Sequence, residues 1–199
     1  MKMLMADYNV GNLHSLKKAL ELAGADVEII TDMSRMADAE CMVFPGVGAF
    51  DCTVENLLPY REDIRKRLEA GVPCLGICIG AQIQLEGSDE GKSPGLGLFK
   101  GRVRLLKSKT VPHMGWNTVE TDDPLLEGIE DRHFYFAHSY YCDPEDRAMV
   151  KGTTEYEGFT FATLMRKANA VATQFHPEKS SDSGLRFLKN FVAYAEDQA

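Results

Sequence analysis

The stretch of this chain that decides its fold is VPCLGICIGAQ, residues 72–82. Its first six residues, 72–77, are apolar on both faces, which is typical of a strand buried inside a parallel sheet. Gly76 and Gly80 then bracket Cys78, two residues to either side. Glycines at these two positions indicate a sharp strand-to-helix turn, because larger side chains beside the central residue would not fit. We therefore expect a buried strand, a tight turn that presents Cys78, and a helix.

Strands and helices alternate before this stretch. Short apolar runs predict three earlier strands, at residues 3–6, 27–30 and 41–44. Apolar residues at helical spacing predict a helix over 13–23, with Asn12 as its cap and Gly24 at its end. A charged helix with Ile64 and Leu68 on one face comes next. This rhythm predicts an α/β fold with a doubly wound, flavodoxin-like and mostly parallel sheet.

The second half of the chain has a different pattern. Glycine and proline interrupt residues 94–101, and short apolar or alternating segments follow. These segments predict further strands at residues 102–105, 133–141, 159–165 and 170–175. Apolar residues at helical spacing over 185–195 predict a closing amphipathic helix. Because no linker or repeat divides the chain, we expect added antiparallel strands within a single domain, residues 1–199.

Composition and charge exclude several classes of protein. Of the 199 residues, 44% are hydrophobic and 26% are charged, as in ordinary globular domains. The net charge of −8 disfavours nucleic acid and anionic lipid as partners. No apolar run approaches the roughly 18 to 20 residues of a membrane span, and Asp7 interrupts the start before a signal-peptide core is complete. We therefore expect a cytoplasmic protein.

The cysteines indicate free thiols. Their number, five, is odd, and no second close pair of Cys or His accompanies Cys74 and Cys78. A zinc site needs such a second pair. We expect no metal site and no cofactor.

Cys78 is a candidate nucleophile, and a buried packing cysteine is the alternative. The turn places its sulfur at the start of a helix, where partial positive charge favours the thiolate. A thiolate nucleophile also needs a base. Pro177 favours an extended backbone at His176, so the side chains of His176 and Glu178 project to the same side. Glu178 would then hold one ring nitrogen while the other faces the sulfur, unless the two form an ordinary surface pair.

An acyl-transfer site also needs hydrogen-bond donors for the oxyanion. The turn offers the backbone N–H of Ile79. The glycine-bracketed segment 45–48, which follows another predicted strand, offers a second donor, although most such segments are simple turns. The other histidines considered lack a comparable acid partner and strand-end context, and we expect packing, surface or interface roles for His14, His113 and His133.

The glycine-bracketed cysteine, together with the distant His176-Pro177-Glu178, resembles the class I (triad) glutamine amidotransferases. The segments that resemble one branch of this family are residues 7–13, 45–50, 112–117, 134–140 and 176–180. The resemblance implies an enzyme that hydrolyses glutamine to glutamate and ammonia and passes the ammonia to a partner protein. For this branch the implied partner is a (β/α)8-barrel cyclase of histidine biosynthesis, which forms imidazole glycerol phosphate and aminoimidazole carboxamide ribonucleotide.

The same resemblance implies a role for each matching residue. Cys78 is the implied nucleophile, His176 the base, and Glu178 the orienting carboxylate. The residues implied to bind glutamine are Gln82, Glu90, Ser139 and Tyr140. Those implied at the oxyanion hole are Val47, Gly48 and Ile79, and those implied to face the partner are Asn12, Trp116, Tyr135 and Lys179.

Three positions depart from the usual pattern of the family. Asn9 stands where glycine is common, and asparagine tolerates the left-handed backbone that glycine serves there. Ile79 and Ala81 replace the more usual leucine and methionine beside the cysteine. Both remain apolar, so we expect the turn to keep its chemistry.

Two alternatives stay open. The chain could serve another synthase, in pyridoxal phosphate, anthranilate or guanylate synthesis, although residues 113–117 and 135–141 argue against this. It could instead be a flavodoxin-like protein with a reactive regulatory cysteine, which would release no ammonia. For the glutaminase we expect weak activity in isolation and a large gain with the partner and its nucleotide, because Val47 lies between flexible glycines.

Overall fold

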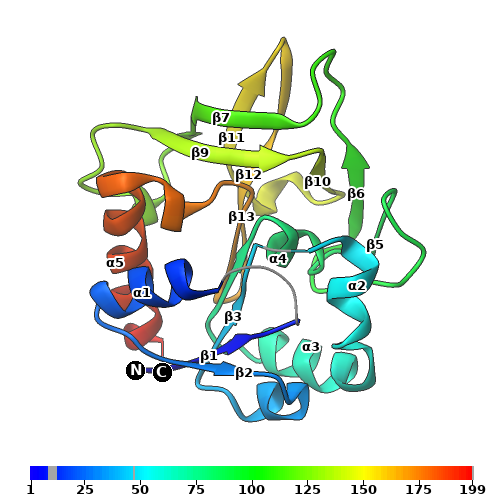
Figure 1. Cartoon of the computed structure of the whole chain (residues 1–199), viewed down its shortest axis with the longest axis vertical. Coiled ribbons are helices and arrows are strands. Elements are labelled where there is room, and N and C mark those ends of the chain that lie inside the picture. Colours follow the sequence, from blue (N-terminus) through cyan, green and yellow to red (C-terminus); the bar gives the residue numbers. More distant parts are fainter. Residues whose placement is uncertain (9–12, 47, 199) are drawn as a thin grey trace.

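The computed structural model describes residues 1–8, 13–46 and 48–198 of the chain. A mixed sheet forms its centre, and the parallel half of this sheet has the strand order β2-β1-β3-β4-β13. These strands are β1 (Lys2–Ala6), β2 (Asp26–Ile30), β3 (Cys41–Phe44), β4 (Cys74–Ile77) and β13 (Ala170–Thr173). Because this order is that of flavodoxin-like sheets, the predicted fold class is confirmed (Figure 1).

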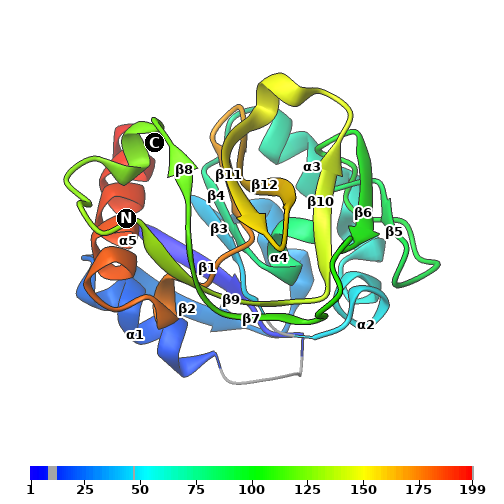
Figure 2. The ribbon, with the colours of Figure 1, turned by 90° about the horizontal axis from the view of Figure 1, so that it is seen from above.

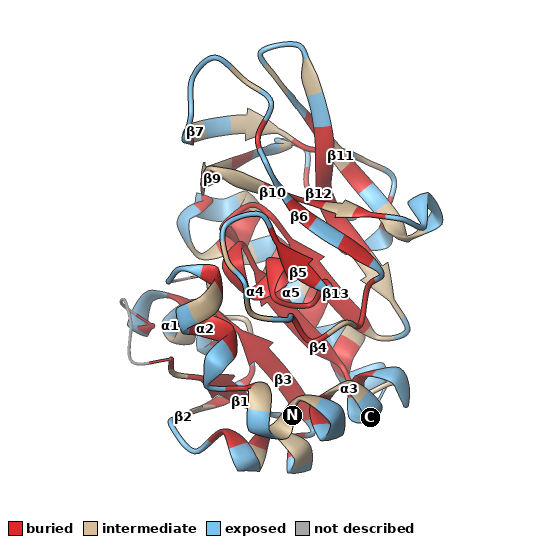
Figure 3. Ribbon diagram, turned by 90° about the vertical axis from the view of Figure 1, so that its right-hand side faces the viewer, coloured by how far each residue is buried: buried red, intermediate tan, exposed pale blue. Residues whose placement is uncertain are grey.

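Helices cover both faces of the parallel half (Figure 1). The helices are α1 (His14–Leu22) and α5 (Ser181–Asp197) on one face, and α2 (Phe50–Glu55) and α3 (Arg61–Glu69) on the other. Side chains alternate along a strand, so Met3 and Met5 pack toward α1 and α5 while Leu4 packs toward α2 and α3. The strands β3, β4 and β13 are almost wholly apolar, as strands that are covered on both faces are. They form the buried centre in Figure 3.

Antiparallel strands extend the sheet beyond β13. β12 (Phe159–Lys167) pairs antiparallel with β13, and the order continues through β10 (Tyr140–Pro144) and β6 (Gly101–Leu105), also antiparallel, to β5 (Gly87–Ser88), which pairs parallel with β6. β11 (Val150–Tyr156) forms a hairpin with β12 and also pairs with β8 (Glu120–Thr121). The expected antiparallel addition in the second half is therefore present.

A separate two-stranded ribbon crosses the top of the parallel half (Figures 1 and 2). It consists of β7 (His113–Thr118) and β9 (His133–His138), which pair antiparallel. β9 also meets the chain just beyond β13, through a bridge between Tyr135 and His176. The ribbon therefore lies at the carboxyl ends of the parallel strands, where open α/β sheets build their sites.

The prediction of a single strand over residues 133–141 is wrong. The structure divides it at Ser139 into β9 and β10, because β9 pairs with β7 in the ribbon whereas β10 pairs with β6 in the main sheet. The aromatic run continues across the break, so hydrophobicity alone does not reveal the change of sheet. The predicted strand ends also shift: β4 begins at Cys74, after Pro73, and β13 ends at Thr173.

The helix ends are partly as expected. Gly24 follows α1 with a φ of +107°, as a glycine that ends a helix does. At the other end, Leu13 occupies the cap position without a side-chain hydrogen bond, and Asn12 lies outside the described residues. The remaining helical turns are α4 (Ile79–Gln82), η1 (Met33–Asp38), η2 (Leu58–Tyr60), η3 (Pro124–Leu126), η4 (Arg147–Met149) and η5 (Pro177–Lys179). No helix within the described parts of the chain has the length and apolar character to cross a membrane.

Candidate active site

Cys78 occupies the turn between β4 and α4 with a left-handed φ of +50°. A Cβ at Gly80 would lie 1.9 Å from the carbonyl oxygen of Phe44, and one at Gly76 would lie 2.4 Å from the carbonyl oxygen of Gly80. Both positions therefore require glycine, because backbone from a neighbouring element occupies the space of a side chain. A non-glycine residue in this conformation is strained, and such strain concentrates at functional sites.

The helix after Cys78 is shorter than expected. α4 spans only four residues, Ile79–Gln82. A single turn carries little of the macrodipole that a longer helix builds up. The helix dipole therefore stabilises the Cys78 thiolate less than the sequence suggested. More of this stabilisation must come from nearby side chains.

His176 is held in place by its backbone. Its N–H donates to the carbonyl oxygen of Tyr135 on β9 at 2.8 Å. Its carbonyl oxygen accepts from the buried hydroxyl of Ser180 at 2.6 Å. The ring packs against Gly46, where a Cβ would lie 2.8 Å from Cε1 of His176. The imidazole is thus fixed from three elements of the fold.

Cys78, His176 and Glu178 come together. Nδ1 of His176 lies 2.8 Å from Oε1 of Glu178, and the ring also interacts with Cys78. Both Cys78 and His176 are buried. Burial opposes protonation of His176, but the hydrogen bonds with Cys78 and Glu178 outweigh it and raise the pKa of His176 to about 10. The arrangement favours an imidazolium beside a thiolate, with a carboxylate behind the ring.

A cavity of about 150 Å³ opens beside Cys78. It is lined by Gly48, Cys78, Ile79, Gln82, Glu90, Ala137, His138, Ser139 and Tyr140. The residues expected to bind glutamine all lie in this wall, together with two of the three expected at the oxyanion hole. The third, Val47, lies outside the described residues. Oε2 of Glu90 accepts a hydrogen bond from the backbone N–H of Phe50 at 3.1 Å, which fixes the acid at the start of α2.

Sequence reasoning assigned no role to Gln174, which contacts the sulfur. Nε2 of Gln174 lies 3.5 Å from Sγ of Cys78, and Oε1 of Gln174 accepts from Nε2 of Gln82 at 3.2 Å. Gln174 stands two residues before His176. A polar amide at the end of a largely apolar segment, residues 170–175, was the sequence feature that could have marked Gln174 as a site residue.

The other histidines are not all as expected. His133 has an acid partner, because its Nδ1 lies 2.7 Å from Oδ1 of Asp131, so the expectation of no such partner is wrong. This pair is exposed and lies away from the cavity lining. His113 is buried, and its Nδ1 lies 3.0 Å from Nε2 of His138, whose Nδ1 in turn lies 2.8 Å from the carbonyl oxygen of Tyr140. Burial lowers the pKa of His113 to about 4 and that of His138 to about 3, so both rings are neutral at pH 7.

Three of the residues expected to face a partner gather at the ribbon: Trp116 and Tyr135 belong to it, and Lys179 of η5 lies beside it. Trp116 and Tyr135 are opposite each other in the β7–β9 register, with ring centroids 6.2 Å apart. Nζ of Lys179 lies 5.9 Å from the centroid of the Tyr135 ring. Trp116 is 52% exposed and its neighbour on the strand, Met114, is 64% exposed. The fourth expected residue, Asn12, lies outside the described residues.

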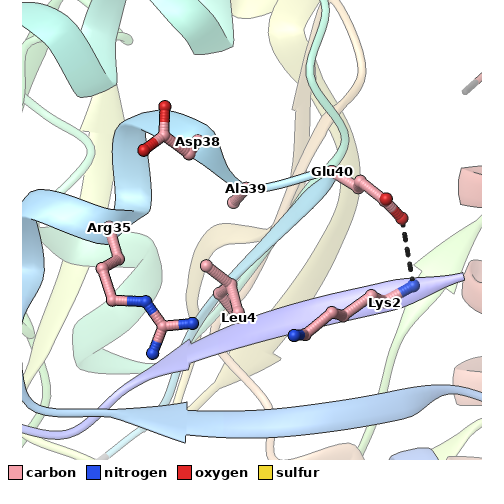
Figure 4. A pocket seen from close by; sticks show the side chains of 6 residues that line it. All are labelled: Lys2, Leu4, Arg35, Asp38, Ala39 and Glu40. Carbon is pink, nitrogen blue, oxygen red and sulfur yellow. Dashed lines mark hydrogen bonds between the residues drawn. The ribbon is translucent and has the colours of Figure 1, made fainter.

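Another cavity, of about 160 Å³, lies at the opposite end of the parallel strands, their amino end (Figure 4). Its lining is Lys2, Leu4, Arg35, Asp38, Ala39 and Glu40. Lys2 and Arg35 both pair with Glu28, and Glu40 accepts from the backbone N–H of Lys2. This cavity lies at the amino ends of β1 and β3, whereas α/β sheets bind ligands at the carboxyl ends. The cavity beside Cys78 is therefore the candidate active site.

The chain matches the family model of class I glutamine amidotransferases over residues 4–195. An imidazole glycerol phosphate synthase subunit HisH from Methanocaldococcus jannaschii is 47% identical over 192 residues, which cover 94% of this chain and 96% of that protein. The protein of the same name from Halobacterium salinarum is 43% identical over 205 residues, covering 98% of this chain and 94% of that protein.

Solved structures share the fold. A crystal structure of a glutamine amidotransferase has a TM-score of 0.76 at 19% identity, covering 97% of this chain and 98% of that chain. A structure of PurLQS from Thermotoga maritima has a TM-score of 0.75 at 17% identity, again covering 97% of this chain and 98% of that chain. At such identities the likeness concerns the fold alone.

Proposed function

Because this chain belongs to the class I glutamine amidotransferases, and among them to the HisH subunits of imidazole glycerol phosphate synthase, we propose that it hydrolyses glutamine at Cys78 and delivers the ammonia to a synthase partner. The observation that carries this proposal is the meeting of Cys78, in the wall of a cavity, with His176 and Glu178. Family membership argues against a regulatory cysteine protein, and the HisH relatives argue against the other synthases considered.

The reaction has two steps. The Cys78 thiolate attacks the carbonyl carbon of the glutamine side-chain amide, forming a C–S bond and a tetrahedral oxyanion. The oxyanion collapses, the C–N bond breaks, and the His176 imidazolium gives its proton to the departing ammonia. The neutral imidazole then takes a proton from water, and the water oxygen attacks the carbonyl carbon of the γ-glutamyl thioester. The C–S bond breaks, which releases glutamate and restores the Cys78 thiolate beside the His176 imidazolium. Glu178 holds the ring and stabilises its charged form throughout.

The cavity wall suits the substrate. In our proposal Glu90 receives the α-ammonium group of glutamine and the Ser139–Tyr140 backbone receives its α-carboxylate, because these residues line the cavity beside Cys78. Gln82 lines the same wall and would bind the substrate there. The backbone N–H of Ile79 would donate to the oxyanion. Val47 and Gly48 complete this oxyanion hole in our proposal, on the strength of the family resemblance.

Ammonia released into water would be protonated and lost, so a docked acceptor is needed. We assign that role to a cyclase subunit with a (β/α)8 barrel, which forms imidazole glycerol phosphate and aminoimidazole carboxamide ribonucleotide in histidine biosynthesis. The exposed Trp116 and its neighbours Tyr135 and Lys179 support docking on the ribbon, directly above His176; Asn12 belongs to this face by resemblance. The cytoplasm, a reducing compartment, would keep the Cys78 thiol free.

Ammonia release from glutamine tests the proposal. The purified chain is assayed alone and with a barrel cyclase and its nucleotide, beside the variants Cys78→Ala and Cys52→Ala. Cys52 is an exposed cysteine and serves as the matched control. We expect weak release alone, a large gain with the cyclase, no release from Cys78→Ala, and full release from Cys52→Ala. Turnover that survives in Cys78→Ala would overturn the assignment of the nucleophile.

A further inference from the structure

Gln174 is a buried amide that the proposed reaction leaves without a role. It follows β13 directly, and its backbone N–H donates to the carbonyl oxygen of Thr163 at 2.9 Å. Its side chain is 2% exposed and lies between Sγ of Cys78 and the amide of Gln82. A polar group in such a place is retained only if its hydrogen bonds are made. Each end of this amide therefore needs an assigned partner.

The orientation of the amide follows from a backbone carbonyl. The oxygen of Tyr140 can only accept, so the atom of Gln82 that lies 2.9 Å from it is the nitrogen, Nε2. The same Nε2 lies 3.2 Å from the side chain of Gln174, which must therefore present its oxygen there. The nitrogen of Gln174 is left facing Cys78. The chain of contacts thus fixes which end of Gln174 points at the sulfur.

We infer that Gln174 is a further catalytic residue, whose side-chain N–H donates a hydrogen bond to the sulfur of Cys78 and stabilises it as the thiolate. The inference rests on the proposed function, in which that sulfur is the nucleophile. The thiolate has no proton of its own, so a donor 3.5 Å away favours it over the thiol. The short helix α4 supplies little of this stabilisation, which leaves it to Gln174 and His176.

Other groups face the sulfur and must be told apart from Gln174. The titratable ones are His176, Cys142 on β10, and Glu90 and His138 in the cavity wall. The carbonyl oxygen of Ala137 lies 3.8 Å from Sγ and can only accept, so it favours the thiol. Burial raises the pKa of Cys142, which keeps it a neutral thiol. Among these neighbours, Gln174 places an N–H donor 3.5 Å from the sulfur, and His176 acts on the sulfur through its charged ring.

Alkylation of Cys78 by iodoacetamide, followed across pH by peptide mass spectrometry, measures its thiolate fraction. The test compares the natural chain with Gln174→Glu and Gln174→Met. The first keeps the oxygen that accepts from Gln82 but loses the donor, and the second loses both. We expect the midpoint of alkylation to rise by about one pH unit in Gln174→Met, roughly a tenfold loss of rate below the midpoint. In Gln174→Glu we expect a larger rise, because the new carboxylate also repels the thiolate. The rate at high pH stays the same, because access to the sulfur is unchanged.

The activity readout separates a catalytic role from a structural one. We expect kcat for glutamine hydrolysis near neutral pH to fall about tenfold, with KM changed less than about twofold, because Gln174 does not line the cavity. Gln84→Met is the matched control: Gln84 is equally buried near the same turn, but its Nε2 donates to the carbonyl oxygen of Gly80. Alkylation of exposed Cys52 in the same digest gives an internal reference.

Unchanged midpoints in folded Gln174→Glu and Gln174→Met would overturn the inference, and so would an equal shift in Gln84→Met. Thermal melting establishes that each variant is folded, and the near-isosteric Gln174→Glu provides the test if the methionine variant does not fold. Alkylation does not depend on turnover. Failure of the proposed function, seen as turnover in Cys78→Ala, is therefore distinct from failure of this contact.

Discussion

Gly46 lies against the imidazole ring of His176, and filling this contact tests the importance of the ring position. A Cβ at position 46 would lie 2.8 Å from Cε1 of His176, 3.0 Å from Cγ2 of Ile77 and 3.1 Å from the carbonyl oxygen of Ile77. Ordinary contact begins at 3.4 Å, so Gly46→Ala must open the first gap by at least 0.6 Å (3.4 minus 2.8). The ring gives way more easily than Ile77, because hydrogen bonds hold the backbone of His176 while its side chain can still rotate, whereas Ile77 belongs to the buried strand β4.

The size of the effect follows from this displacement. A misplacement of about 1 Å in a reacting group costs roughly 10²-fold in rate, so we expect kcat of Gly46→Ala to fall by about 10- to 100-fold. Overpacking a buried site costs about 1–3 kcal/mol, against a net stability of roughly 5–15 kcal/mol for an ordinary domain. The variant should therefore remain folded while its turnover falls.

Ammonia release in the presence of the cyclase, paired with thermal unfolding, measures both effects. Gly152→Ala on β11 is the matched control, since its Cβ would also be crowded, 3.1 Å from Cβ of Leu164 and 3.2 Å from Cβ of Thr121. β12 separates this strand from β13, the strand that leads to His176. We expect this control to lose stability and keep its kcat. Full turnover in Gly46→Ala would refute the reasoning, and an equal loss in Gly152→Ala would assign the effect to general destabilisation.

Three further predictions concern single side chains. Glu178→Gln should let the pKa of His176 fall from about 10 toward 6.5 in an NMR titration and lower kcat by about 10²- to 10⁴-fold; an unaltered titration would contradict this. Gly80→Ala places a Cβ 1.9 Å from the carbonyl oxygen of Phe44. The free energy of unfolding in urea should therefore fall by about 3 kcal/mol or more. A variant as stable as the natural chain would contradict the described turn geometry. Burial lowers the pKa of His113 from 6.5 to about 4, so the unfolded chain binds its proton first: stability is full above pH 6.5 and declines as pH falls toward 4. In His113→Phe the free energy of unfolding, measured with urea at pH 7, 5.5 and 4.5, should decline less as the pH falls. An equal decline in the variant and the natural chain would show that His113 is not its cause.

The parallel half of the fold could be predicted from the sequence because its strands are buried on both faces. Such strands are continuous apolar runs, and glycines such as Gly24 mark the ends of the helices between them. The ribbon could not be predicted in this way. Its first strand, β7, places its apolar residues Met114 and Trp116 on the exposed side, and the aromatic run of β9 continues past Ser139 into another sheet.

The candidate site was more accessible to sequence reasoning than the ribbon. Cys78 and His176 each follow a buried strand, and the carboxyl ends of neighbouring parallel strands meet at one edge. Contacts that depend on side-chain orientation were not accessible. Gln174 could not be distinguished from a packing residue until the carbonyl oxygen of Tyr140 fixed the direction of the amide chain. The pairing of His113 with His138 likewise needs the register of β7 against β9.

The central claim is that Cys78 is the nucleophile for a glutamine-shaped substrate, and covalent labelling tests it most directly. A chloromethyl ketone analogue of glutamine is incubated with the chain, and the modified peptide is identified by mass spectrometry. The thiolate displaces chloride and forms a C–S bond. We expect one adduct, on Cys78, that free glutamine suppresses and His176→Ala greatly slows. Labelling confined to the exposed Cys52, or labelling of Cys78 that glutamine does not affect, would contradict the account.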